Sequence, residues 1–310
     1  SIRLDGQEAS GLGPGAEFPD GTAVSVNVDI GPLFRFGRAE IANRAPAPVH
    51  EDDIVRTPEE AGFQDAAPAQ AEGIRTAARL SREAWREQGH PLVRIDGQEI
   101  RARHTERLLD ARLVLDPGPR ADFGEIVLRG TRRMDPGFVA YMTGIRAGTE
   151  FDPGDIERGR KRLDRLGVFP TRRIEEAESL APDGTLPLSV FVAERKPRRF
   201  GVGATYSSID GGGLEGYFLH RNLFGRAESL RFDAKVGGLG ENLAADRLDY
   251  SLAMTFTRPG TLSPDTDFVG TLNAMRDVNE TYTETSAGGT AGFTHYASDD
   301  LTVKFGVFAR

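Results

Sequence analysis

The chain shows two hydrophobic periods, with a change near residue 197. Before that point, runs in which every second residue is apolar are mixed with stretches in which apolar residues recur three or four positions apart. This mixture is typical of strands combined with amphipathic helices. After residue 197 only the alternation continues, and it is broken by turns rich in Gly, Asn and Asp. The pattern predicts an α+β part followed by an all-β part.

The first part contains an internal repeat. Residues 29–37 and 116–124 both carry an Asp-x-Gly-Pro motif that is followed four residues later by Phe-Gly. Each copy follows one strand-like run and leads into another. Such self-similarity indicates a repeated supersecondary unit, which here reads as strand, helix, helix, strand, strand. Because residues 2–8 also resemble residues 93–99, we expect the chain to begin partway through a unit.

Two helices are predicted in the second complete unit. Asp152 and Pro153 open the longer one, because Asp is a favoured N-cap and Pro fits the first helical position. Gly167 is placed to end it, and a shorter helix is expected over 135–143. In the first complete unit the long helix is expected over about residues 69–88. The core-facing residues expected on the long helices are Ile74, Ala77, Ala78 and Trp85 in the first unit and Ile156, Leu163 and Leu166 in the second.

The all-β part accommodates seven strands, each with one apolar and one polar face. In one of them Leu230, Phe232 and Val236 alternate with charged residues. The runs are about 9–11 residues long, as a tilted strand needs to cross a bilayer, whereas globular strands average about 5–6 residues. A soluble sandwich with one solvated face is the alternative. The length favours a transmembrane barrel with a polar interior, and since no strand edge can face lipid unpaired, we expect more strands after Arg310.

Composition excludes several classes of function. Among 310 residues, Lys and Arg number 39 and Asp and Glu 47, which gives a net charge of −8 and argues against nucleic acid as a partner. No Cys is present, so thiolate metal sites and cysteine nucleophiles are excluded. The five His residues are scattered, and no phosphate-binding loop or nucleophile elbow occurs. We therefore expect no catalytic, cofactor-binding or metal-binding residues, and a protein that is not an enzyme.

A basic cluster stands directly before the first strand of the all-β part. It consists of Arg195, Lys196, Arg198 and Arg199. One interpretation is a solvated polar linker. The other is that these charges lie near anionic headgroups or contact a partner.

Local motifs give a family resemblance. Phe151-Asp152, followed by the apolar helix positions and by Leu-Gly-Val-Phe at 166–169, resembles the second-helix signature of a POTRA domain. Phe-Gly-Val-Gly at 200–203 and Arg-Asn-Leu-Phe-Gly at 221–225 resemble the first hairpin of the barrel in the BamA/TamA family of outer-membrane assembly factors. Within this family the pattern is most similar to TamA.

The resemblance implies POTRA units in the periplasm followed by a barrel in the outer membrane. On this basis residues 1–31 are the C-terminal part of a first POTRA unit, 32–118 and 119–197 are two POTRA units, and 198–310 are the N-terminal part of an incomplete barrel. It also implies that the protein helps to insert β-barrel proteins and autotransporters. The partners that it implies are unfolded outer-membrane proteins, outer-membrane lipid and a TamB-like protein that binds through the POTRA units.

The first barrel strand is the candidate site. A strand entering lipid needs backbone partners, and a first strand that pairs weakly with the last can offer its edge as a template. Gly201 and Gly203 have no side chains to pack, which weakens that pairing. The residues expected to template a client strand are Phe200, Gly201, Val202, Gly203, Ala204, Thr205, Tyr206, Ser207 and Ser208.

Two other functions remain open at this point. A two-partner secretion transporter also combines POTRA units with a barrel, but it exports one dedicated client. A soluble periplasmic binding module, with repeated α/β units and a β-sandwich, is the more distant alternative.

Overall fold

The structure is a computed structural model that describes residues 2–4, 7–8, 24–26, 32–47, 56–207, 211–239, 248–278 and 282–310. The chain divides into two compact units. One comprises Ser1–Trp85 with Val93–Pro117, and the other comprises Arg86–Leu92 with Gly118–Arg310. The predicted boundaries at residues 31, 118 and 197 stay predictions. No helix among the described residues is long and apolar enough to span a membrane.

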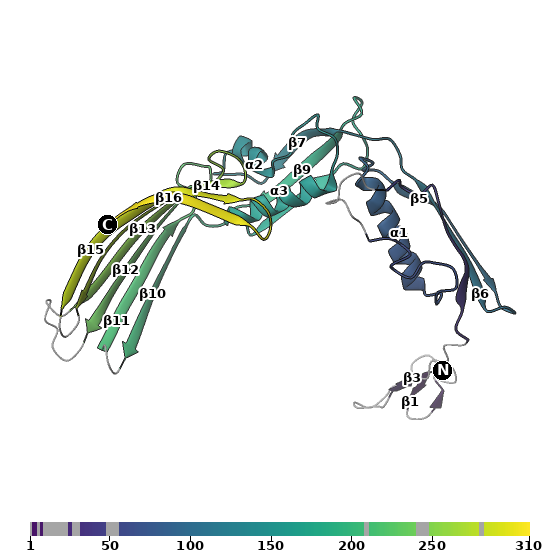
Figure 1. Cartoon of the computed structure of the whole chain (residues 1–310), viewed down its shortest axis with the longest axis horizontal. Coiled ribbons are helices and arrows are strands. Elements are labelled where there is room, and N and C mark those ends of the chain that lie inside the picture. The colour runs from purple at the N-terminus through teal and green to yellow at the C-terminus, as the bar shows by residue number, and fades with distance from the viewer. Residues whose placement is uncertain are drawn as a thin grey trace. The chain divides into compact units, whose positions relative to one another are not determined.

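The first unit contains two small sheets. The larger has the strand order β4-β6-β5, in which β6 pairs in parallel with β4 and antiparallel with β5 (Figure 1). Phe36, Phe63 and Leu113 form its core with one face of helix α1. The elements are β1 (Ile2–Leu4), β2 (Gln7–Glu8), β3 (Val24–Val26), β4 (Arg35–Ala42), α1 (Ala71–Arg86), β5 (Arg94–Arg103) and β6 (Leu108–Asp116).

The described residues between β4 and β5 contain one helix, where the sequence predicted two. Residues 58–62 form a single turn instead. The Thr57 hydroxyl accepts the N–H of Glu60, and the Glu60 carboxylate accepts the N–H of Thr57 at 2.9 Å, which is a capping box. Gly62 then ends the turn at a φ of 87°. The start signal is present, but the left-handed residue follows too soon for a helix to continue.

Helix α1 is shorter than predicted, and one of its core assignments is wrong. Ile74 and Ala77 are buried as expected, and Leu80 is buried with them. Trp85 is only half-buried, and its indole N–H donates to the carbonyl of Asn43 at 2.9 Å. A ring at the last turn of a helix reaches beyond the core, so Trp85 holds the chain after β4 by a hydrogen bond.

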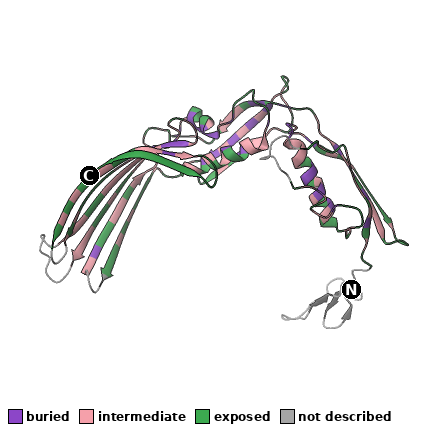
Figure 2. Ribbon diagram, viewed as in Figure 1, coloured by how far each residue is buried: buried purple, intermediate pink, exposed green. Residues whose placement is uncertain are grey.

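The repeat unit at the start of the second compact unit has the order expected from the sequence. Its sheet has the order β7-β9-β8, and α2 and α3 lie against it. Asp152 caps α3 as predicted, Asp135 caps α2, and Gly167 adopts a φ of 65°. Figure 2 shows buried residues gathered in these elements. The elements are β7 (Phe123–Arg129), α2 (Pro136–Thr143), α3 (Pro153–Arg165), β8 (Thr171–Glu176) and β9 (Leu186–Ala193).

The remaining residues form a seven-stranded antiparallel sheet with neighbours in chain order, which confirms the predicted succession of hairpins (Figure 1). Among the described residues the outer strands β10 and β16 each pair on one side only, so the sheet is not closed. The strands are β10 (Arg198–Ser207), β11 (Gly211–His220), β12 (Ser229–Leu239), β13 (Asp249–Arg258), β14 (Thr266–Val278), β15 (Thr283–Tyr296) and β16 (Thr302–Ala309).

Candidate functional site

The two faces of the seven-stranded sheet differ in chemistry. On one face Phe200, Phe218 and Phe232 occupy matching positions on β10, β11 and β12. Ring pairs continue this row across β13 to β16, with centroid distances of 6.5, 5.5 and 5.4 Å, through Phe256, Phe268, Phe293 and Phe305. The opposite face carries Glu215, Lys235 and Ser251 in register. An aromatic row on an apolar face, with a polar face behind it, is the pattern of a membrane barrel.

Strand β10 contains the predicted templating residues. Its side chains on the apolar face are almost uncovered, with Phe200, Val202 and Tyr206 80%, 89% and 84% exposed. The strand pairs with β11 in unbroken register from Arg198 to Ser207. Ser208 lies outside the described residues. The expected weak pairing with a last strand concerns the other edge of β10, which has no neighbour among the described residues, and it stays a prediction.

The space beside Gly201, where other residues carry a side chain, is filled by a neighbouring ring. The ring of Tyr217 crosses it from β11, and a Cβ at Gly201 would lie 2.4 Å from Tyr217 Cε1. The guanidinium carbon of Arg231 lies 4.5 Å from the centre of the same ring, and Arg231 pairs with Asp233 at 2.6 Å. A ring packed over a strand glycine restores contacts that the glycine lacks. Glycine at 201 therefore makes room for Tyr217 on the polar face.

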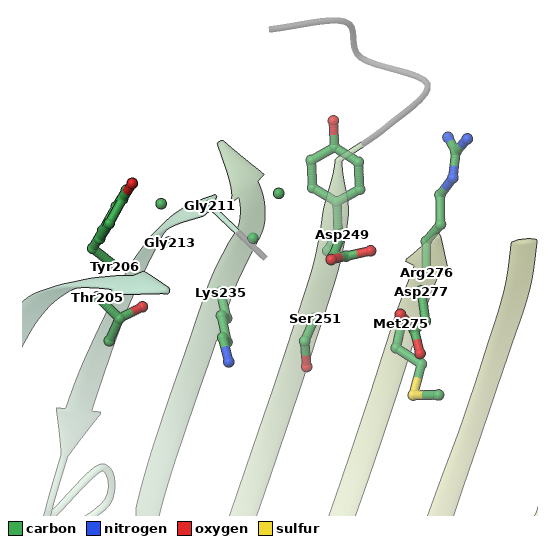
Figure 3. A pocket seen from close by; sticks show the side chains of 14 residues that line it. Thr205, Tyr206, Gly211, Gly213, Lys235, Asp249, Ser251, Met275, Arg276 and Asp277 are labelled. Carbon is green, nitrogen blue, oxygen red and sulfur yellow. The ribbon is translucent and has the colours of Figure 1, made fainter. Parts of the chain in front are cut away.

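A polar hollow of about 460 Å³ lies at the strand ends distant from the repeat unit. In Figure 3, Thr205, Lys235 and Ser251 project to one side of the sheet, and Tyr206 and Arg276 project to the other. Both charged and small residues line the hollow. The hollow is open and its lining residues lie on both faces of the sheet, so it marks the rim of the sheet and not an enclosed small-molecule pocket.

The turn between β11 and β12 is held closed by two side chains. Asn222 Oδ1 accepts the N–H of Ala227 at 3.0 Å, and the Glu228 carboxylate accepts the N–H of Arg226 at 2.9 Å. Glu228 is buried, while Gly225 and Ala227 adopt φ angles of 98° and 57°. The Asn-Leu-Phe-Gly motif that carried the resemblance is therefore a turn with a specific backbone path.

This turn binds the loop that precedes α2. The N–H of Asp135 donates to the carbonyl of Gly225 at 2.8 Å, and Asn222 Nδ2 donates to the carbonyl of Arg133 at 3.3 Å. From the linker between β9 and β10, the Glu194 carboxylate accepts the backbone N–H groups of residues 132–134 at 2.7–3.0 Å. The first hairpin of the sheet is thus joined to the repeat unit by backbone as well as side-chain bonds.

A second connection joins α3 to the turn between β13 and β14. Arg162 donates to both carboxylate oxygens of Asp265, at 2.9 and 2.6 Å, and to the carbonyl of Thr143 at 3.0 Å. Arg165 donates to the carbonyl of Pro264 at 2.6 Å, and its guanidinium carbon lies 4.0 Å from the centre of the Tyr296 ring. A bidentate pair with stacking of this kind fixes orientation as well as distance.

Two carboxylates at these connections titrate below their ordinary range. Burial raises the pKa of Asp265, but hydrogen bonds from Arg162 and the charges of Arg162 and Arg165 outweigh burial and lower it below 3.8. Burial likewise raises the pKa of Glu194, but the N–H groups of residues 132–134 lower it below 4.5. Both groups are therefore anionic at neutral pH.

Comparison with known proteins identifies the barrel region. Residues 222–310 match the Omp85 superfamily domain. This part of the chain is similar to an Omp85 domain. BamA, the outer membrane protein assembly factor of Nitratidesulfovibrio vulgaris, is 21% identical to the chain over 233 residues, which cover 75% of this chain and 28% of that protein. The chain thus spans less than a third of the length of that relative.

One solved structure agrees in fold with the Omp85 match. BamA from Haemophilus ducreyi lacking POTRA domains 1–3 aligns with a TM-score of 0.67 at 12% identity, over 89% of this chain and 50% of that chain. CdiB from Acinetobacter baumannii aligns with a TM-score of 0.46 at 12% identity, over 88% of this chain and 52% of that chain. The likeness to the BamA/TamA family is confirmed, together with the fold class and an outer-membrane location with periplasmic POTRA units. The assignment to TamA stays a prediction.

Sequence reasoning missed the residues that connect the Omp85 domain to the POTRA unit. Glu228 carried a weak signal, because an acid stands just after the Asn-Leu-Phe-Gly turn and before an alternating strand. Arg162 and Asp265 carried no such signal. The basic residues of α3 are typical of a solvated helix face, and Asp265 lies in an ordinary turn. The described residues contain no group of three or more His, Asp or Glu side chains placed to hold a metal ion.

Proposed function

We propose that this chain is part of an outer-membrane protein assembly factor, which helps to insert β-barrel proteins, including autotransporters, by offering β10 as a template. The observation that carries this proposal is that β10 is the first strand of the sheet, carries glycine at positions 201 and 203, and pairs with β11 in a regular hairpin. The Omp85 match and the BamA relative support it. The proposed activity is assisted folding and not enzymatic.

The physical advantage of templating is backbone pairing. An unpaired N–H or C=O in lipid costs several kcal/mol, so a client strand gains by pairing before it meets the hydrocarbon. Strand β10 presents such an edge, with Phe200 and Val202 facing lipid and Gly201 and Gly203 facing the polar side. A client strand with the same alternation therefore extends both faces of the sheet.

The decisive experiment is disulfide crosslinking in the full-length protein, for which the absence of cysteine from these 310 residues provides a clean background. Thr205→Cys lies on the edge strand, and Ser251→Cys lies on the same polar face of the interior strand β13. A stalled barrel precursor with a cysteine in its terminal strand is expected to crosslink to Thr205→Cys and not to Ser251→Cys. No crosslink at Thr205→Cys would reject templating at β10.

The same pair of variants separates assembly from two-partner secretion. A secreted client passes through the interior, so it would crosslink to Ser251→Cys on the polar face of a central strand. That pattern, without an edge crosslink, would favour the transporter. The polar face alone suits both functions, and the position of the crosslink distinguishes them.

A TamB-like partner of the POTRA units belongs to this proposal. Strand β5 keeps one edge unpaired among the described residues, and Ile100 on it is half exposed, so it offers a place for strand addition. Deletion of residues 32–118 from the full-length protein is expected to abolish recovery of the partner by pull-down. Undiminished recovery would exclude this unit as the dock.

A further inference from the structure

A second hollow lies where the linker enters the sheet. Its volume is about 900 Å³, and it opens between the linker, the base of β10 and β11, and the turn that follows β11. Its lining includes the basic residues Arg133, Lys196, Arg198 and His220, and no described acidic residue lines it. In a chain with a net charge of −8, this concentration of positive charge needs an explanation.

The cations of this hollow are available to a ligand. Arg133, Lys196 and Arg198 are exposed, and among the described residues no salt bridge engages their charged groups. The carboxylate near Arg133 belongs to Glu194, which is occupied by backbone N–H groups. His220 Nδ1 is buried without a hydrogen-bond partner among the described residues.

Two of the cations of the hollow lie one step along the strands from the aromatic row. Arg198 and His220 face each other in register and share the apolar face with Phe200 and Phe218, which form the next pair on that face. Two residues along a strand correspond to about 7 Å. The headgroup layer on each side of the hydrocarbon is about 5–8 Å thick. Phe224, which is 77% exposed, adds an apolar rim to the hollow.

We propose that this hollow binds the phosphate of an anionic glycerophospholipid from the leaflet that faces the POTRA units. The acyl chains lie against Phe200 and Phe218, and Lys196 and Arg198 bind the phosphate, with Arg133 on the opposite wall. Arginine forms paired hydrogen bonds to phosphate oxygens, and lysine adds a compact charge. The lipid would thus occupy the base of the templating strand. The inference requires the membrane location but not client insertion.

The test uses the full-length protein reconstituted in phosphatidylcholine nanodiscs with and without phosphatidylglycerol, followed by native mass spectrometry of retained lipid. The double variant Lys196→Gln/Arg198→Gln is compared with Arg258→Gln. Arg258 is an exposed residue on the same apolar face, at the corresponding end of β13 and outside the hollow. Each charge near a membrane surface contributes about fivefold in affinity, so the double variant is expected to bind phosphatidylglycerol about 25-fold more weakly. Arg258→Gln is expected to bind it like the wild type.

Three outcomes would overturn the proposal. Unchanged retention in the double variant would exclude the hollow, and an equal loss in Arg258→Gln would indicate general surface attraction. Displacement of the lipid by millimolar inorganic phosphate would indicate a site for free anions. Should the double variant fail to fold, a phosphatidylglycerol with a photoreactive headgroup is applied to the wild type. Labelling of peptides containing residues 196–198 or 222–225 supports the site, and labelling elsewhere rejects it.

Discussion

At the scale of single residues, small groups determine how the first hairpin packs. Gly201 leaves room for the ring of Tyr217, and Gly225 and Ala227 take the positive φ angles that the turn after β11 requires. Asn222 and Glu228 then hold that turn. These positions explain motifs that are visible in the sequence only as a family likeness.

Substituting Gly201 should destabilise the hairpin. In Gly201→Ala the new Cβ meets Tyr217 at 2.4 Å, whereas in Gly216→Ala, on the neighbouring strand, the nearest atom lies at 3.4 Å. Overpacking costs about 1–3 kcal/mol, so the full-length Gly201→Ala protein should lose its heat-resistant form at a temperature several degrees lower. Gly216→Ala should stay near the wild type, and adding Tyr217→Ala should restore part of the loss. Equal midpoints for both single variants would contradict this account.

The carboxylate of Glu194 should stabilise the loop over 132–134 in a pH-dependent way. Its pKa is lower in the folded protein than the ordinary 4.5, so its contribution is complete above about pH 5 and is lost as the pH falls through the lowered pKa. Charged hydrogen bonds of this kind contribute about 1 kcal/mol when partly solvated. In Glu194→Gln, amide exchange of the loop should be about fivefold faster than in the wild type at pH 7.

The ratio of exchange rates between variant and wild type cancels the intrinsic effect of pH. It should fall toward one as the pH drops through the lowered pKa of Glu194, because the wild-type carboxyl then becomes protonated as well. Glu178→Gln, at an exposed position of the same unit, is the control and should give a ratio near one throughout. A ratio independent of pH would show that charge is not the cause.

At the scale of elements, ion pairs join helix α3 to two periplasmic turns of the sheet. The pair Arg162 and Asp265 is largely buried, with the Asp265 side chain 26% exposed, whereas the pair Lys161 and Asp299 lies in solvent, with Asp299 70% exposed. Buried, bidentate pairs hold geometry, and solvated pairs contribute about 0–1 kcal/mol. The two pairs lie on the same helix and thus allow a matched comparison.

Neutralising Asp265 should loosen this connection. Asp265→Asn removes the charge that Arg162 and Arg165 share, at a cost of about 1.5–3 kcal/mol. Spin labels at Glu157→Cys and Leu262→Cys, at an exposed site on α3 and in the turn, should give one narrow distance distribution in the wild type and a broad one in Asp265→Asn. Asp299→Asn should resemble the wild type. A narrow distribution in Asp265→Asn would assign the connection to other contacts.

At the scale of the whole molecule, the repeat units and the sheet differ in how their apolar side chains are shielded from water. The POTRA unit over β7–β9 buries an apolar core, and Figure 2 shows buried residues there and mostly intermediate or exposed ones in the sheet. Large apolar side chains on one face of the sheet, such as Phe200 and Val202, are exposed. Such a sheet is stable when lipid covers the apolar face and its edges are paired. The protein as a whole therefore needs a membrane.

Full-length protein should fractionate with the outer membrane and change its gel mobility on boiling, because a closed barrel resists detergent until it is heated. The measurement is envelope fractionation followed by electrophoresis with and without heating. Recovery of the protein in the periplasm, without a change in mobility, would favour the alternative of a soluble periplasmic binding module. Truncation within the sheet is the control, since an open sheet should show no heat-dependent shift.

The local patterns of the sequence were enough to predict the seven strands, the cap at Asp152, and the two chemically distinct faces. These features depend on neighbouring residues: alternation sets the faces of a strand, and a cap bonds within one turn. The sequence was a poorer guide where tertiary context overrides local signals. The apolar period of the helix assigns Trp85 to the core, but its side chain is only half-buried and binds the carbonyl of Asn43. The capping box at Thr57 starts a single turn, which ends at Gly62.

By itself, therefore, the sequence determined the order of the elements from β7 onward, the polarity of each face of the sheet and the family likeness, because all of these depend on short-range order. Only the tertiary structure decided which residues meet across long separations. It paired Arg162 with Asp265, placed Glu194 on residues 132–134, and gathered Lys196, Arg198 and His220 around one hollow. Such contacts depend on how elements pack and turn, and packing brings together residues that no local pattern relates.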